Sequence, residues 1–185
     1  MKKLVILSMA LVFVFTLVQA QTPVMEKEKV KEAKKELKTE RVALRKLEGT
    51  QVSELSKTNF FTDFGKVPNV KWRRDATFDV AEFTKDGKNM TAFYDFDSRL
   101  VGTVQNKTFA DLPAEGQKNI KVKYKDYSVG TVLFYDDNEA NETDMMLYNT
   151  QFDDADNYFV ELSKAGKKIV VQVTTDGNIM FFKQL

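Results

Sequence analysis

Residues 161–185 read ELSKAGKKIVVQVTTDGNIMFFKQL. Apolar and polar residues alternate on both sides of an Ala-Gly pair at Ala165 and Gly166, and an Asp-Gly pair at Asp176 and Gly177 follows. Alternation with a period of two is typical of β-strands, and glycine-containing pairs of this kind are typical of tight hairpin turns. The stretch therefore predicts three antiparallel strands joined by two short turns.

An earlier part of the chain has the same pattern. Residues 82–105 align with residues 161–184 at a constant shift of 79 and without a gap, and Gly87 falls on Gly166. Six of the 24 aligned positions are identical, and both turns and the alternating apolar positions coincide. The alignment predicts one unit, a helix followed by an antiparallel meander, that occurs twice in tandem.

The helices of the two units are predicted from periodicity and capping signals. Ser53 is a plausible N-cap for a short helix that ends before Gly65 and Pro68. Asp111 and Pro113 are expected to open a second helix, as cap and first-turn residue. Residues 69–105 predict three strands, with turns at Asp86-Gly87 and Asp97-Ser98. The apolar side of the first helix is expected to comprise Val52, Leu55, Phe60 and Phe64.

The predicted fold class is α+β, with helices on one face of a curved antiparallel sheet. We divide the chain into a signal peptide (1–20), a charged helical tail (21–49) and a tandem-repeat domain (50–185). The first segment has a basic start, an apolar stretch and short side chains before Ala20, as in a cleavable signal peptide. An uncleaved membrane anchor is the alternative, and the absence of Cys excludes lipid attachment at the cut.

The tail is rich in Ala, Leu, Glu, Lys and Arg, which are strong helix formers. It carries a net charge of +3, whereas the rest of the chain after the signal peptide carries −4. A solvated helical spacer is the favoured interpretation, and a helix whose thin apolar stripe docks on the domain or pairs with another helix is the alternative. A nucleic-acid partner is not expected, because the domain itself is not basic.

Composition excludes much catalytic chemistry. The chain has no Cys and no His, so it has no thiol nucleophile, no Cys/His zinc site and no imidazole base. Asp95 and Asp97 could form a carboxylate pair, but they lie at a predicted turn. The acidic run from Asp136 to Asp144 could offer oxygen ligands to calcium, yet it lacks the EF-hand spacing, and a solvated loop is favoured. We expect no enzyme activity, no cofactor and no metal.

The sequence resembles the PepSY-like proteins related to β-lactamase-inhibitor protein, which are small exported proteins of Bacteroides-like and Flavobacterium-like bacteria. The resemblance covers residues 52–185. It rests on NVKW (69–72), FTKDGKNMTAFYDFDSRL (83–100), the Leu-Pro pair at 112–113, and YFVELSKAGKKIVVQVTTDGNIM (158–180). One departure is Ser98, where the pattern has glycine. The resemblance implies a binding or inhibitory role in the periplasm or outside the cell, and no catalysis.

Aromatic residues suggest where a partner would bind. In a sheet with helices on one face, alternate residues point away from the helices. If Tyr94 and Val173 point toward the helices, then Phe93, Phe159 and Phe182 point away from them. These rings are either covered by a loop, by the tail or by edge packing, or they form a recognition face for another protein of the cell envelope. The candidate partner-binding residues are Phe93, Phe159, Phe182, Glu82, Glu161, Gln172 and Trp72.

Export is expected to leave a mature chain that begins at Gln21, because the cut after Ala20 follows suitably short side chains. The mass of the intact exported protein measures this directly. A chain that retains Met1 would contradict the prediction.

Overall fold

The computed structural model describes residues 23–185, and the predicted signal peptide lies outside the described residues. The helices are α1 (Pro23–Glu48), α2 (Glu54–Phe64) and α3 (Ala114–Lys123), with a short 3-10 helix η1 (Phe109–Asp111) before α3. The ten strands are β1 (Lys71–Arg74), β2 (Asp79–Lys85), β3 (Lys88–Tyr94), β4 (Leu100–Lys107), β5 (Ser128–Asp137), β6 (Met146–Leu147), β7 (Thr150–Gln151), β8 (Asn157–Lys164), β9 (Lys167–Thr174) and β10 (Ile179–Gln184).

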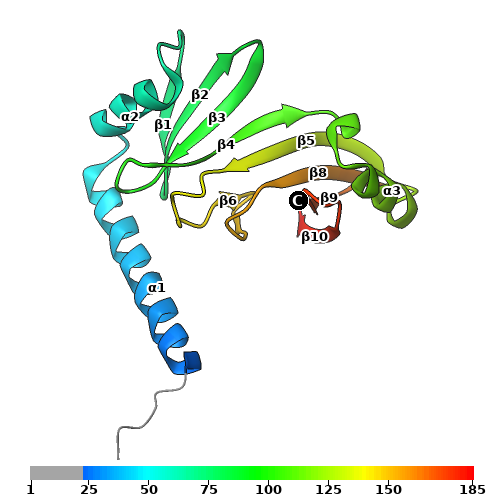
Figure 1. Ribbon diagram of the computed structural model, residues 1–185, viewed down its shortest axis with the longest axis horizontal. Helices are drawn as coiled ribbons and strands as arrows, with labels where there is room; N and C mark the ends of the chain where they lie inside the picture. The colour runs from blue at the N-terminus through cyan, green and yellow to red at the C-terminus, as the bar shows by residue number, and fades with distance from the viewer. Residues whose placement is uncertain (1–22) are drawn as a thin grey trace, which may run out of the picture. The chain divides into compact units, whose positions relative to one another are not determined.

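Eight strands form one antiparallel sheet in the order β1-β2-β3-β4-β5-β8-β9-β10 (Figure 1). The remaining two, β6 and β7, form a small hairpin between β5 and β8. The predicted α+β class with a large antiparallel sheet is therefore confirmed. Each of α2 and α3 precedes four strands of the sheet, and the tandem repeat itself remains a prediction from the sequence.

Residues 69–105 contain four strands instead of the predicted three. An additional turn separates β1 from β2, because the Asp75 carboxylate accepts the backbone N–H groups of Thr77 at 2.8 Å and Phe78 at 2.6 Å. An Asp side chain that binds the backbone two or three residues ahead reverses the chain without needing glycine. The sequence analysis relied on glycine-containing pairs and so missed this turn.

The predicted turns lie where the sequence placed them. Gly87 and Gly166 have positive φ angles of 72° and 80°, which glycine adopts without steric cost. Ser98 adopts φ 60° at the position where the second hairpin has Gly177. The Ser98 hydroxyl shares hydrogen bonds with Ser56 at 3.0 Å and Ser53 at 3.1 Å, and these contacts stabilise a conformation that Ser rarely adopts.

Helices α2 and α3 cover the same face of the sheet. Ala92 on β3 lies under α2, and it pairs with Thr103 on β4, which in turn pairs with Asp136 on β5. Paired residues point to the same face of the sheet, and alternate residues of β5 continue this face to Val132, which lies under α3. Ser53 caps α2 as predicted, and accepts the Leu55 N–H at 3.2 Å. Leu55 itself is exposed, contrary to prediction. The residues under α3 include Val132, Val160, Leu162, Val171 and Val173.

Helix α3 begins later than its predicted cap. Asp111 belongs to η1 and accepts the backbone N–H and the hydroxyl of Thr108, each at 2.7 Å. Pro113 is the N-cap residue of α3. Helix α3 lies close to the last turn of the sheet, because a Cβ atom on Gly177 in that turn would come within 2.7 Å of the backbone nitrogen of Gly116, and a Cβ atom on Gly116 would come within 2.7 Å of Val173 Cγ1. Both sides of this contact therefore depend on small residues.

The opposite face of the sheet is also apolar. Its residues pack under the segment Asn138–Asp156, which we call the insertion, and the insertion contributes Met145 at 0% exposure and Phe152 at 6%. Figure 1 shows the β6–β7 hairpin beside the sheet strands β5 and β8. The sheet residues in this second core are Phe78, Val80, Phe93, Val101, Val104, Tyr135, Phe159 and Val170.

Helix α1 is 26 residues long and is divided between two compact units, the second of which comprises Leu44–Leu185. Considered by itself, α1 has a thin apolar stripe with substantial exposure at Val30, Leu37 and Leu44. Within residues 23–185, none of the helices combines the length and the apolar character that a membrane crossing requires.

Replacement of Phe159 by Ala should lower the free energy of unfolding by about 3–5 kcal/mol, because it opens a cavity in the second core. Phe181→Ala is the matched control, since Phe181 is 57% exposed and its loss should cost under about 1 kcal/mol. Chemical denaturation of both variants measures the difference. Equal stability of the two variants would show that the second core contributes little.

Candidate functional site

A groove lies on the part of the sheet face that points away from α2. Lys71 on β1, Glu82 on β2, Thr91 on β3 and Val104 on β4 are register neighbours, so they form one row across four strands. Successive residues of a strand point to opposite faces, and this row therefore faces away from Ala81 and Ala92, which lie under α2. The row forms the centre of the groove.

A second row lies nearer the tip of the β2–β3 hairpin. Thr84 pairs with Asn89, and Asn106 pairs with Leu133 on β5. The cavity volume of the groove is about 730 Å³. Its complete lining is Pro68, Asn69, Lys71, Glu82, Phe83, Thr84, Asn89, Met90, Thr91, Val104, Asn106 and Leu133.

The chemistry of the groove suits recognition. Val104 and Leu133 supply an apolar floor, whereas Asn106 and Thr91 supply amide and hydroxyl groups that can donate and accept hydrogen bonds. Side chains of this kind can pair with the backbone of an extended segment or a loop. Within residues 23–185, no group of three or more His, Cys, Asp or Glu residues is arranged to hold a metal ion.

Two of the aromatic rings predicted to contact a partner are buried. Phe93 and Phe159 point away from the helices as expected, but their exposures are 7% and 0%. Phe152 of the insertion packs on Phe159 with ring centroids 4.8 Å apart, and on half-buried Phe182 at 6.1 Å. The insertion therefore covers Phe159, as in the alternative that the sequence left open, and a direct contact of this ring with a partner requires that the insertion move.

The other predicted residues are dispersed. Glu82 lines the groove, whereas Glu161 accepts the hydroxyl of Tyr148 in the insertion at 3.0 Å. Gln172 is buried opposite Phe159 in the sheet register. Trp72 lies under α2 on the other face, with its ring 5.5 Å from that of Phe60. The structure thus gathers Phe159, Phe182, Gln172 and Glu161 near the insertion and separates them from Glu82 and Trp72.

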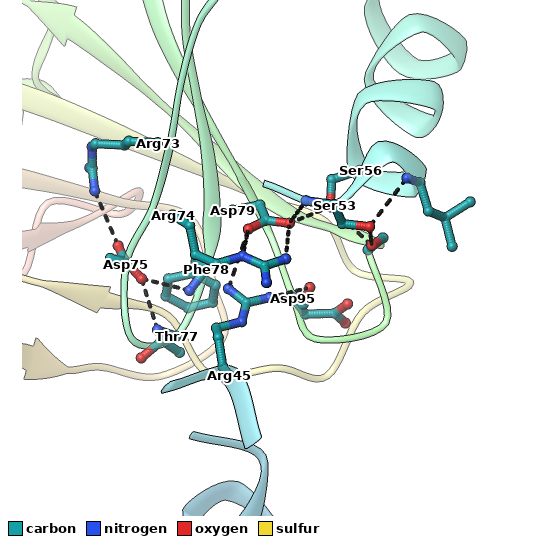
Figure 2. Close-up of polar contacts among 12 residues, drawn as sticks. Arg45, Ser53, Ser56, Arg73, Arg74, Asp75, Thr77, Phe78, Asp79 and Asp95 are labelled. Carbon is teal, nitrogen blue, oxygen red and sulfur yellow. Dashed lines mark hydrogen bonds and ion pairs between the residues drawn. The ribbon is translucent and has the colours of Figure 1, made fainter. Parts of the chain in front are cut away.

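Asp79 is the centre of a buried polar cluster that the sequence analysis did not identify. The side chain has 0% exposure, and Arg74 binds it with both Nε and Nη2, at 2.6 Å and 3.1 Å. Arg45 Nη1 lies 3.6 Å from the same carboxylate. Figure 2 shows the two guanidinium groups converging on Asp79. Two cations around one buried carboxylate offset much of the cost of removing its charge from water.

The start of α2 adds further hydrogen bonds to Asp79. The backbone N–H of Ser53 and the hydroxyl of Ser56 donate to Oδ2 at 3.0 Å and 2.8 Å. Burial by itself would raise the pKa of Asp79, but the bonds from Arg74, Ser53 and Ser56 and the charge of Arg45 lower it below 3.8. A carboxylate is also favoured at this place because the N-terminus of a helix carries partial positive charge.

Asp95 links the same cluster to the insertion. Its backbone oxygen accepts a hydrogen bond from Arg45 Nη2 at 3.3 Å, and its carboxylate accepts one from Asn141 Nδ2 at 3.0 Å. The Arg45 guanidinium also lies 4.6 Å from the ring centre of Phe96. The cluster therefore ties the end of α1, the β3–β4 turn and the insertion together, and we interpret it as structural.

Arg45 changes where the tail can be separated from the domain. It lies within the predicted tail of residues 21–49, yet only 4% of it is exposed and it pairs with Asp79. In the sequence it is one of nine basic residues in the tail, and it carries no signal that distinguishes it from the solvated ones. A truncation that leaves the domain intact should therefore stop before Leu44.

Known structures have the same fold. A DUF2874 family protein from Bacteroides uniformis matches with a TM-score of 0.60 and 15% identity, over 72% of this chain and 90% of that chain. A BLIP-like protein from Bacteroides fragilis matches with a TM-score of 0.57 and 16% identity, over 73% and 87%. A "putative periplasmic" protein from Bacteroides eggerthii matches with a TM-score of 0.59 and 14% identity, over 72% and 89%.

These similarities define a class of fold. The chain is an α+β protein with the open antiparallel sheet of the BLIP-like structures, and at 13–16% identity the likeness concerns the fold alone. It agrees with the inhibitor-like part of the resemblance read from the sequence, whereas the PepSY-like part remains a prediction. Comparisons with protein-family models and with curated proteins give no match.

Asp79→Asn should lower the free energy of unfolding by about 3–5 kcal/mol, because it removes the buried charge that pairs with Arg74 and Arg45. Asp126→Asn is the control, since it breaks an exposed pair with Lys164 (3.0 Å) that should contribute under about 1 kcal/mol. Denaturant titrations at neutral pH compare them. A loss no larger than that of the control would contradict the central role of Asp79.

The same carboxylate predicts a dependence on acid. Because the pKa of Asp79 is lowered on folding, its contribution is present above pH 3.8 and is lost as the pH falls below that value. The wild-type stability should therefore decrease more steeply than that of Asp79→Asn as the pH falls from about 4. Parallel stability curves for the two proteins would contradict this assignment.

Proposed function

We propose that this chain is an exported, non-catalytic binding module that recognises another protein through the groove between β1 and β5. The single observation that carries this proposal is the groove itself, about 730 Å³ in volume and lined by both apolar and hydrogen-bonding side chains. This volume lies within the range of natural ligand sites. Because most of the lining belongs to a strand surface, a loop or extended segment of a partner fits it best.

Two further observations support a proposed compartment and a proposed class of partner. One neighbour in fold is named as putative periplasmic and another as BLIP-like, and the predicted signal peptide directs the chain to the same side of the membrane. A partner in the cell envelope is therefore proposed, with inhibition of an envelope enzyme as the specific form of binding. A nucleic-acid partner and a membrane anchor after cleavage are not part of the proposal.

A non-catalytic role is supported by composition. The chain lacks His and Cys, and the carboxylates of its buried cluster are engaged by guanidinium, hydroxyl and amide groups. Asp95, one of the two turn carboxylates considered for acid–base chemistry, accepts the N–H groups of Asp97 and Arg99 and closes its own turn. These contacts give the carboxylate a structural role.

Of the partner-binding residues proposed from the sequence, Glu82 lines the groove, and the others are assigned different roles. Glu82 remains a direct contact, and Lys71 opposite it adds a charge of the other sign. Phe93, Phe159 and Phe182 support the face from within the second core. Glu161 and Gln172 belong to the part of the face occupied by the insertion, and Trp72 supports β1 from the helix side.

A second candidate function is interaction through α1. Val30, Leu37 and Leu44 follow one another at spacings of seven residues and are 55%, 49% and 56% exposed. This spacing places them on one side of the helix, as in helices that pair with another helix. In this alternative the folded domain is a carrier, and the helix makes the functional contact.

Thr91→Arg should weaken partner binding at least about tenfold, because a long charged side chain fills the centre of the groove. Thr62→Arg is the matched control, since it introduces the same side chain at an exposed position on α2. The partner is first captured from an envelope extract with the mature protein, and its affinity for each variant is then measured. Equal affinities would exclude the groove as the contact surface.

Deletion of residues 21–43 distinguishes the two candidate functions. It removes most of α1 but retains Arg45, so the domain should keep its melting temperature within a few degrees. Binding that survives the deletion supports the groove, whereas binding that disappears while the domain stays folded supports α1.

A further inference from the structure

Strand β1 is one of the two edges of the eight-stranded sheet (Figure 1). Within the described residues it pairs with β2 alone, and the register is continuous over all four of its residues. The other edge, β10, has an irregularity in its register between Phe181 and Lys183. Irregularities of this kind interrupt the ladder and hinder the addition of a further strand. Strand β1 is therefore the edge better suited to accept one.

The backbone of Trp72 faces the open side of β1. The Asp75 N–H donates to the Phe78 oxygen at 3.0 Å, so these two opposite residues form a hydrogen-bonded pair. Hydrogen-bonded and non-hydrogen-bonded pairs alternate along an antiparallel ladder. Counting back along the register, Trp72 falls in a non-hydrogen-bonded pair with Ala81. The N–H and C=O of Trp72 therefore point away from β2 and toward the edge of the sheet.

The side chains of β1 determine which segment fits this edge. Lys71 and Arg73 are exposed and flank Trp72 on the groove face, and Lys71 lines the groove itself. The ion pairs of Arg73 with Asp75 and Glu82 join side chains that are 39–52% exposed, so a competing carboxylate can replace them at little cost. The half-buried ring of Trp72 lies on the helix face. An added strand thus meets two cations on one face and an aromatic ring on the other.

We propose that the partner of the groove adds an extended segment to β1 as an antiparallel strand, and that this segment has an acidic–apolar–acidic pattern. Its apolar residue forms a hydrogen-bonded pair with Trp72 and lies beside the Trp72 ring. The two acidic residues point to the groove face and lie beside Lys71 and Arg73, because opposite charges in cross-strand positions attract. The inference rests on the proposed function only in assigning the segment to the partner that the groove binds.

A second copy of this chain does not meet the same requirements. If two β1 edges paired around Trp72, Lys71 of each copy would lie opposite Arg73 of the other. Like charges in cross-strand positions repel, and cations on an edge strand are a common means of preventing two identical edges from pairing. The charges of β1 therefore favour an acidic segment from another protein over self-association.

A synthetic peptide tests the inference on the mature chain without a captured partner. The probe is the acetylated and amidated peptide Thr-Thr-Glu-Val-Glu-Thr-Thr. Trp72 is the single Trp of the chain, so its fluorescence reports binding at β1. A saturable change with a Kd below about 1 mM is expected. At saturation the hydrogen exchange of the Trp72 amide should slow at least about fivefold, whereas that of Arg73, which the register directs toward β2, should not change.

Methylation of the peptide backbone separates strand addition from simple charge attraction. A methyl group on the valine nitrogen removes the N–H that pairs with the Trp72 oxygen, and should weaken binding at least about tenfold. A methyl group on the nitrogen of the following glutamate is the matched control, because that N–H points away from β1 and both peptides carry the same charge. Equal losses for the two methylated peptides would overturn the proposal.

Variants of the chain test the charge requirement. Lys71→Glu should weaken binding of the unmethylated peptide about fivefold or more, because it replaces an attraction by a repulsion. Lys168→Glu makes the same change at an exposed position of β9 and should retain wild-type affinity. Equal affinities of these two variants, or no saturable binding to the wild type, would also overturn the proposal. Thr91→Arg lies two strands from β1 and should leave the peptide affinity unchanged, so this result is independent of whether a partner binds the groove.

Discussion

Both faces of the sheet are apolar, and most of the structure answers the need to cover them. Tyr94 and Phe93 are neighbours on β3, yet both are buried, and Phe159 and Val160 repeat this on β8. Because successive residues point to opposite faces, two buried neighbours require cover on each side of the strand. Helices α2 and α3 cover one face, and the insertion covers part of the other. The groove is the part of that second face that retains hydrogen-bonding side chains.

The buried polar cluster holds one end of this arrangement in place. Asp79 joins the first residue of β2 to the start of α2 and to the end of α1, and Asp95 extends the connections to the insertion through Asn141. A buried carboxylate is costly unless it is paired, so a displacement of these elements that breaks its contacts is expected to lower the stability of the fold. The cluster therefore contacts both α2, which covers one face, and the insertion, which covers part of the other face, at the same end of the sheet.

Local signals in the sequence were sufficient for the helix α2 and for the glycine-containing hairpin turns, but not for the Asp75 turn that separates β1 from β2. Ser53 capped its helix as predicted, and Gly87 and Gly166 formed the two hairpin turns. Contacts between segments that are distant in the sequence could not be predicted from such local signals. Arg45 resembles the solvated basic residues around it, and the cover of Phe159 by Phe152 depends on how the insertion folds back over the sheet. The apolar run at residues 145–148, between acidic stretches, was the available signal of a covering segment.

The position of the insertion between two paired strands allows its sequence to vary while the fold is retained. Strands β5 and β8 pair directly, with Tyr135 opposite Asn157, so the insertion is in topological terms the loop of a single hairpin. Its length and composition can change without altering the order of the eight strands or the helix layer. Related proteins could thus diversify this surface by exchanging one contiguous segment, much as antibodies vary their loops on a constant framework.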